Sequence, residues 1–179
     1  MKNKLLYLLV FAAVFAFAVA PALAVPQYTG TNWNGLYAGR TQIEVGTINT
    51  YVEESNLHIV ILTYDPWVLV ETHVAVGTNP VNDFPMTKTG NPKVGNFPYA
   101  HTGLNGVNRD EYVIALSEVK GWSAGVPICI AAHAIVTSPL GQETAWGNCG
   151  TPKGTFAGLG LGNANGRGNW ALYYWYPSH

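Results

Sequence analysis

Residues 66–77 read PWVLVETHVAVG, a nearly continuous apolar run that carries two polar side chains, Glu71 and His73. The valines, the tryptophan and the Asp65-Pro66 break before them predict a buried β-strand over 67–76. Because side chains alternate across a strand, Glu71 and His73 point to the same face, about 7 Å apart. Strict alternation predicts Val68, Val70, Thr72, Val74 and Val76 on one face and Trp67, Leu69, Glu71, His73 and Ala75 on the other.

A second apolar strand is predicted over 127–137, PICIAAHAIVT, and it also carries one histidine, His133. Small alanines flank this imidazole and leave space beside it. The motif ETAWG follows and contains Glu143 and Trp146. If the two strands adjoin, Glu71, His73, His133 and Glu143 meet at one place.

Three interpretations of this cluster are open. The preferred one is a buried, hydrogen-bonded group in which a carboxylate fixes a histidine tautomer and braces the fold, without a cofactor. The second is a divalent metal site with Glu71, His73 and His133 as candidate ligands, because two imidazoles and a carboxylate suit zinc and similar ions. The third is acid–base catalysis by a Glu–His pair. No serine or cysteine nucleophile motif accompanies the pair, so no catalytic residue is assigned.

The rest of the chain shows short β-prone runs between turn residues and no helical periodicity. Strands without room for crossover helices predict antiparallel pairing, and we expect an all-β fold, a β-sandwich or jelly roll. Segment 77–108, rich in Pro, Gly and Asn, is expected to be one long loop, and SEVKG (117–121) a helical turn. The predicted strands are 41–53, 57–64, 67–76, 109–116, 127–137, a short strand within 142–150, and 170–176 after a Gly-rich loop at 158–169.

The first 24 residues have the features of a secretory signal peptide. Lys2 and Lys4 precede the apolar run LLYLLVFAAVFAFAVA, and Ala22-Leu23-Ala24 forms an A-x-A-like cleavage site. An uncleaved membrane anchor is the alternative, because the run is about long enough to cross a bilayer. We expect cleavage after Ala24, a single domain over 25–179, and a secreted or cell-surface location without further membrane contact.

The low charge content sets the chemistry expected of the surface. Charged residues make up 11% of the chain, less than half of the usual share, and the formal net charge is −1. Without a basic patch, nucleic acid and anionic lipid are not expected as partners. A neutral, hydrogen-bonding surface rich in aromatic groups favours cell-surface glycans or proteins, or self-association.

The two cysteines, Cys129 and Cys149, are expected to form one disulfide in an exported protein. It would close a loop of roughly twenty residues and contribute about 3 kcal/mol in the chain-entropy description. A cysteine pair that binds a metal is the alternative, although the spacing matches no zinc pattern.

The predicted loop 77–108 holds a second candidate binding surface. Phe97, Tyr99 and His101, together with Phe84, could contact a sugar ring, since loops on a rigid scaffold often carry binding. The competing interpretation is that the Phe-Pro pairs turn inward and plug one end of the fold. The last strand has aromatic residues on both faces, which indicates either that both faces are covered or that the strand pairs with another subunit.

Several of these motifs also resemble a recurring domain of exported bacterial and archaeal proteins, most of them extracellular or surface-anchored. The resemblance rests on the ETH strand, the NP…G-x-FPY loop, AAHA and ETAWG, and it spans about Val45–Trp175. It implies an all-β extracellular module, often attached to longer surface proteins. It implies no established catalytic residues.

We therefore expect a secreted, non-catalytic structural or adhesive component of the cell surface or extracellular matrix, with the capacity to self-associate. One alternative is a carbohydrate-binding module that uses the loop aromatics. The other is a metal-binding enzyme centred on Glu71, His73 and His133.

Overall fold

The computed structural model describes residues 32–148, 154–155 and 171–177. Within these ranges every strand pair is antiparallel, which confirms the all-β prediction. The elements in chain order are β1 (Asn32–Ala38), β2 (Ile43–Glu53), β3 (Asn56–Thr63), β4 (Val68–Gly77), α1 (Pro80–Asp83), the 3-10 turn η1 (Val94–Asn96), β5 (Tyr99–Val107), β6 (Arg109–Ala115), the 3-10 turn η2 (Leu116–Glu118), β7 (Ile128–Ser138), β8 (Gly141–Asn148), β9 (Gly154–Thr155) and β10 (Leu172–Tyr176).

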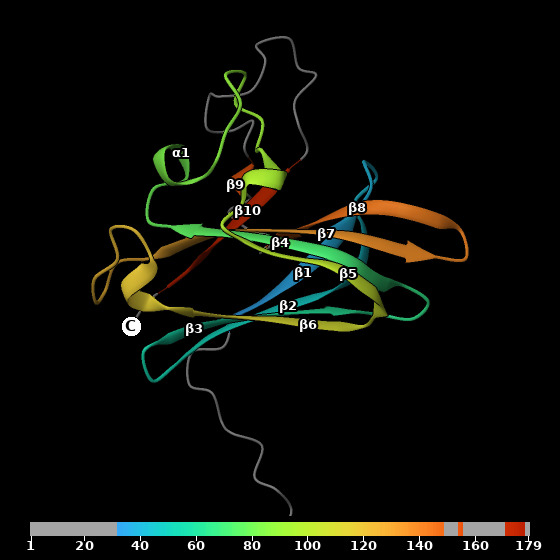
Figure 1. Cartoon of the computed structure of the whole chain (residues 1–179), viewed down its shortest axis with the longest axis horizontal. Helices are drawn as coiled ribbons and strands as arrows, with labels where there is room; N and C mark the ends of the chain where they lie inside the picture. The colour runs from blue at the N-terminus through green and yellow to red at the C-terminus, as the bar shows by residue number, and fades with distance from the viewer. Residues whose placement is uncertain (1–31, 149–153, 156–170, 178–179) are drawn as a thin grey trace, which may run out of the picture.

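Backbone hydrogen bonds connect the strands along one path, β5-β4-β7-β8-β1-β2-β3-β6. Strand β10 joins this path at β7, and the short β9 pairs with β10. The sheet curls so that β4, β5 and β7 lie over β2, β3 and β6 (Figure 1). The two layers are therefore halves of one nearly closed sheet rather than two separate sheets.

The main core fills the space between these layers. Leu57, Ile59 and Ile61 of β3 have no exposed surface, as expected for every second residue of a half-buried strand. Val74 of β4 and Ile130 of β7 meet them from the opposite layer and are equally buried. Burial of one such side chain stabilises the fold by roughly 1.5–3 kcal/mol.

Strand β10 has aromatic side chains on both faces, and both faces are covered. Tyr174 and Tyr176 belong to the main core, and the Tyr174 hydroxyl lies 2.9 Å from Thr50 Oγ1. Tyr173 lies on the other face, in a second apolar cluster outside the curled sheet. This arrangement agrees with the first of the two interpretations of the last strand.

The register of β4 shifts at Val70. Leu69 pairs with Val136 and Glu71 pairs with Ile135, so Val70 is an extra residue on β4. The bulge turns Leu69 into the main core, where it is fully buried. The prediction that Leu69 shares a face with Glu71 is therefore wrong, because strict alternation fails at a bulge.

Three strands, β1, β5 and the two-residue β9, fall outside the predicted set. β1 reads NWNGLYA and lies in the middle of the sheet, between β8 and β2. β5 falls in segment 77–108, and the prediction of one long loop is therefore wrong for Tyr99–Val107. Positive φ angles at Gly103, Asn105 and Gly106 interrupt its regular geometry and hide the strand from pattern analysis.

Some predictions concern residues outside the described ranges. These are the signal peptide, the Gly-rich loop 158–169, Trp170 at the start of the last predicted strand, and Cys149. None of the helices within the described ranges has the length and hydropathy of a membrane span.

Gly46 is the position in β2 where a side chain is expected to be least tolerated. A Cβ atom here would lie 1.9 Å from the carbonyl oxygen of Leu62 in the paired strand β3. Because this neighbour is backbone, β2 and β3 would have to separate locally. We expect Gly46→Ala to lower the free energy of unfolding by about 1–3 kcal/mol, measured as a lower urea midpoint.

Gly95→Ala is the matched control, because a Cβ atom at Gly95 meets no other atom within 4 Å. Its urea midpoint should equal that of the unmodified protein. Equal midpoints for the two variants would contradict the close approach of β2 and β3 at Gly46.

Candidate functional site

Strands β4 and β7 bring His73 and His133 together on the outer face of the curled sheet. The two residues are direct partners in the antiparallel register, and their ring centroids are 5.9 Å apart. Each residue is only 6% exposed. The structure thus joins the two predicted histidines, but on the face opposite the main core.

Glu71 and Trp146 complete this group. Glu71 Oε1 is hydrogen-bonded to His73 Nε2 two residues further along β4. Trp146 of β8 is the direct partner of His133, and the two rings meet edge to face with centroids 4.8 Å apart. We call Glu71, His73, His133 and Trp146 the outer-face cluster.

The chain between β4 and β5 folds over the same face of the sheet (Figure 1). Phe97 meets Trp146 edge to face at 6.3 Å, and Phe84 meets Tyr173 in the same way at 6.2 Å. Both phenylalanines are about 95% buried. Both side chains therefore turn inward, as the competing interpretation expects, but they cover the outer face of the sheet and do not plug one end of the fold. Phe97 has almost no exposed surface to offer a sugar ring.

Burial controls the chemistry of His133. Loss of water around the ring, and then the neighbouring His73, lower the pKa of His133 to about 3. His133 is therefore neutral at any ordinary pH and is a weak base. A general acid or base works best with a pKa near the operating pH, so this environment is poorly suited to proton transfer.

Two ring nitrogens in the outer-face cluster have no hydrogen-bond partner among the described residues. They are Nδ1 of His73 and Nδ1 of His133, and both are buried. An unpaired buried polar atom costs about 1–3 kcal/mol. The apolar contacts around the two rings offset this cost.

The candidate metal set of Glu71, His73 and His133 is not supported by the geometry. In the described part of the chain, no group of three or more His, Cys, Asp or Glu side chains is arranged to hold an ion. Glu71 and His73 are bonded to each other, while His133 packs against Trp146.

Glu143 does not join the outer-face cluster, so that part of the prediction is wrong. It lies three residues before Trp146 on β8, and alternation places it on the opposite face. Its carboxylate lies against the turn between β1 and β2, where a Cβ atom on Gly39 would be 3.3 Å from Glu143 Oε2.

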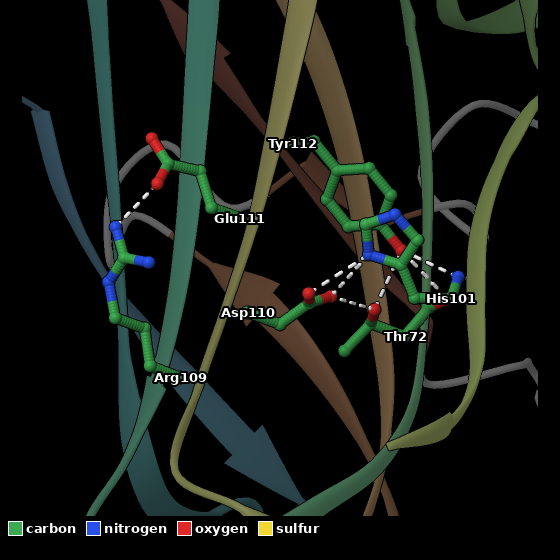
Figure 2. A network of polar contacts seen from close by, with 6 residues as sticks. All are labelled: Thr72, His101, Arg109, Asp110, Glu111 and Tyr112. Carbon is green, nitrogen blue, oxygen red and sulfur yellow. Dashed lines mark hydrogen bonds and ion pairs between the residues drawn. The ribbon is translucent and has the colours of Figure 1, made fainter.

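A second polar network closes the gap between β5 and β6, the two ends of the strand path (Figure 2). Thr72 Oγ1 donates to Asp110 and lies 2.6 Å from the Tyr112 hydroxyl. That hydroxyl donates to the Thr72 carbonyl at 2.9 Å and accepts from the His101 backbone N–H at 3.1 Å. We call Thr72, His101, Asp110 and Tyr112 the seam network.

The side chain of His101 also takes part in the seam network. Its Nδ1 lies 2.9 Å from Asp110 Oδ1, and its ring stacks on Tyr112 with centroids 4.4 Å apart. His101 was expected in a loop but belongs to β5. Burial raises the pKa of Tyr112 to about 12, so its phenol stays protonated and keeps its hydrogen bond to Thr72.

The seam network contains a hydroxyl, a histidine and a carboxylate, but not as a nucleophilic triad. His101 contacts Asp110 rather than the Thr72 hydroxyl, so it cannot take the hydroxyl proton directly. Thr72 is fully buried. The network therefore holds β5 against β6. His101 is one of the candidates named from the sequence, whereas Thr72, Asp110 and Tyr112 are not, because their contact with it depends on closure of the sheet.

The two remaining candidates, Tyr99 and Cys129, are hydrogen-bonded to neighbouring residues of the fold. Tyr99 is partly buried against the main core, and its hydroxyl donates to Glu118 at 3.3 Å. Cys129 is buried on the outer face, and its Sγ lies 3.0 Å from the Gly77 carbonyl oxygen. Because Cys149 lies outside the described ranges, the Cys129–Cys149 disulfide stays a prediction.

Comparison of the chain with protein-family models, with curated proteins and with solved structures found no match.

Tyr112→Phe tests the seam network. Loss of the hydroxyl leaves the buried Thr72 carbonyl and the His101 N–H without this partner, and we expect a loss of about 1–3 kcal/mol in urea unfolding. Hydrogen exchange of the His101 amide should also become faster. Tyr64→Phe is the control, because the Tyr64 hydroxyl contacts Glu44 at 3.5 Å on an exposed surface. Similar small losses in both variants would contradict a stabilising seam.

His133→Phe tests the buried neutral histidine. The folded-state pKa of about 3 lies below the ordinary value of 6.5, so the unfolded chain takes up the proton first as the pH falls. Stability should decline between about pH 6.5 and 3, by up to about 1.4 kcal/mol per pH unit. The phenylalanine keeps the ring and removes the titration, so its stability should depend less on pH over this range.

Nuclear magnetic resonance gives an independent measurement in the unmodified protein. The ring signals of His133 should stay constant between pH 8 and 5. A midpoint near the ordinary histidine value would contradict the assignment of a neutral, desolvated ring.

Proposed function

We propose that the protein is a secreted, non-catalytic module that acts as an adhesive or structural component of the cell surface. The signal-peptide features of residues 1–24 and the low charge content support export and contact with neutral surfaces. The Glu71–His73 pair and the group of Thr72, His101 and Asp110 are hydrogen-bonded within the outer-face cluster and the seam network.

The observation that carries the proposal is a group of exposed apolar side chains at one end of the sheet. Antiparallel order places the turns β1–β2, β3–β4, β5–β6 and β7–β8 at this end, on the right of Figure 1, and we call it the turn end. Leu140 is 93% exposed, Ile43 57% and Tyr64 47%. Exposed apolar groups that gather on one surface are typical of a contact site.

Export is tested by expressing the full chain in a secreting host. We expect the protein outside the cytoplasmic membrane, with Val25 as its N-terminal residue in Edman sequencing. Retention in the cytoplasm with an intact Met1 would contradict a secreted module.

Adhesion is tested by sedimenting the exported protein with cell envelopes of its native host. Ile43→Ser and Leu140→Ser together should weaken binding at least about fivefold, which corresponds to about 1 kcal/mol. Val113→Ser is the matched control, because Val113 is 58% exposed on another part of the sheet. Glu71→Gln should leave binding unchanged. Failure to bind envelopes, or equal loss with Val113→Ser, would contradict adhesion through the turn end.

A further inference from the structure

A small open pocket of about 190 Å³ lies at the turn end. Ile43, Trp67 and Leu140 form apolar walls, and Thr41 and Glu143 supply a hydroxyl and a carboxylate. Drug-sized ligands occupy about 300–1,000 Å³, so this pocket is the size for one ring or one side chain.

The carboxylate of Glu143 is the distinctive group in this pocket. Glu143 is exposed, and its side chain has no hydrogen bond or ion pair with any residue in the described ranges. The glycine at position 39, with φ of +65°, leaves room for it, since a Cβ atom there would lie 3.3 Å from Oε2. None of the described residues that line the pocket is basic, and Arg40, in the same turn, is not among them. The pocket therefore presents an unpaired negative charge beside apolar walls.

We infer that this pocket binds a lysine or arginine side chain of a partner protein. The inference rests on the proposed adhesive function and names the chemistry of its contact. A cation beside Trp67 gains a cation–π interaction, and Glu143 can accept a charge-assisted hydrogen bond from it. Ile43 and Leu140 can cover the methylene stem, which is the apolar part of such a side chain.

A sugar ring matches the pocket less well. Sugars need several hydrogen-bonding side chains around their hydroxyl groups, whereas Ile43 and Leu140 offer none. Among the described residues that line the pocket, Thr41 has a hydroxyl, Glu143 a carboxylate and Trp67 one indole N–H, and the other side chains are apolar or absent. The aliphatic rim and the single unpaired charge favour a cation with an apolar stem.

The test is a titration of the exported protein, followed by nuclear magnetic resonance, with Nα-acetyl-arginine amide. Nα-acetyl-citrulline amide is the neutral control of nearly the same shape, and methyl α-glucoside represents a sugar. We expect the arginine probe to shift the amide signals of Gly39 and Gly141 and the indole signal of Trp67. It should bind at least about fivefold more tightly than the citrulline probe.

Glu143→Gln should abolish the preference for arginine over citrulline, whereas Glu54→Gln, in the exposed turn between β2 and β3, should not. Equal binding of the two probes, no shifts at the three pocket groups, or shifts there with the glucoside alone would each overturn the inference. Envelope binding that survives Glu143→Gln would also overturn it but would leave the proposed adhesive function standing. Absence of envelope binding by the unmodified protein would instead remove the proposed function.

Discussion

The pairing of β4 with β7 is the interaction on which the rest of the structure depends. Strand β7 is buried on both faces from Ile128 to Ala134, with Ile130 in the main core and His133 in the outer-face cluster. A slip of one residue would exchange these faces, moving isoleucines outward and the histidine into the core. The register is therefore fixed by burial on two sides. Strand β4 in turn contributes Glu71 and His73 to the outer-face cluster and Thr72 to the seam network.

Small side chains on the outer face explain why a second apolar layer forms there. Ala75 and Ala131 leave space above the sheet, and Phe84 and Phe97 fill it from the segment that joins β4 to β5. Closing this layer removes water from His133, which accounts for its lowered pKa. The same covering leaves Nδ1 of His73 and Nδ1 of His133 without a hydrogen-bond partner in the part of the chain that the structure describes, so apolar packing takes precedence over hydrogen bonding around these rings.

Sequence patterns predicted the strands that have continuous apolar runs, such as β3 and β7. They missed β1 and β5, in which Asn and Gly interrupt the apolar residues. The His73–His133 pair could be foreseen from alternation and small neighbours. Three facts depended on tertiary structure: the bulge at Val70, the separation of Glu143 from the cluster, and the seam network. The contacts of His101 with Asp110 and Tyr112 join β5 and β6, the two end strands of the path. No local pattern marks residues that meet only when a sheet curls.

The two polar networks and the turn end differ in exposure, and this difference is the basis of the proposed binding role. Catalysis needs accessible groups that can gain and lose protons, whereas Thr72 and His133 are buried and serve cohesion. The proposed contact site needs exposed groups that are held in place, and hydrogen bonds in the β7–β8 turn hold Leu140 in this way. The Leu140 N–H donates to Ser138 Oγ at 3.2 Å, and Thr137 Oγ1 donates to the Gly141 carbonyl at 3.4 Å. These bonds fix the turn so that Leu140 projects into solvent, and a side chain ordered before contact loses less entropy when a partner covers it.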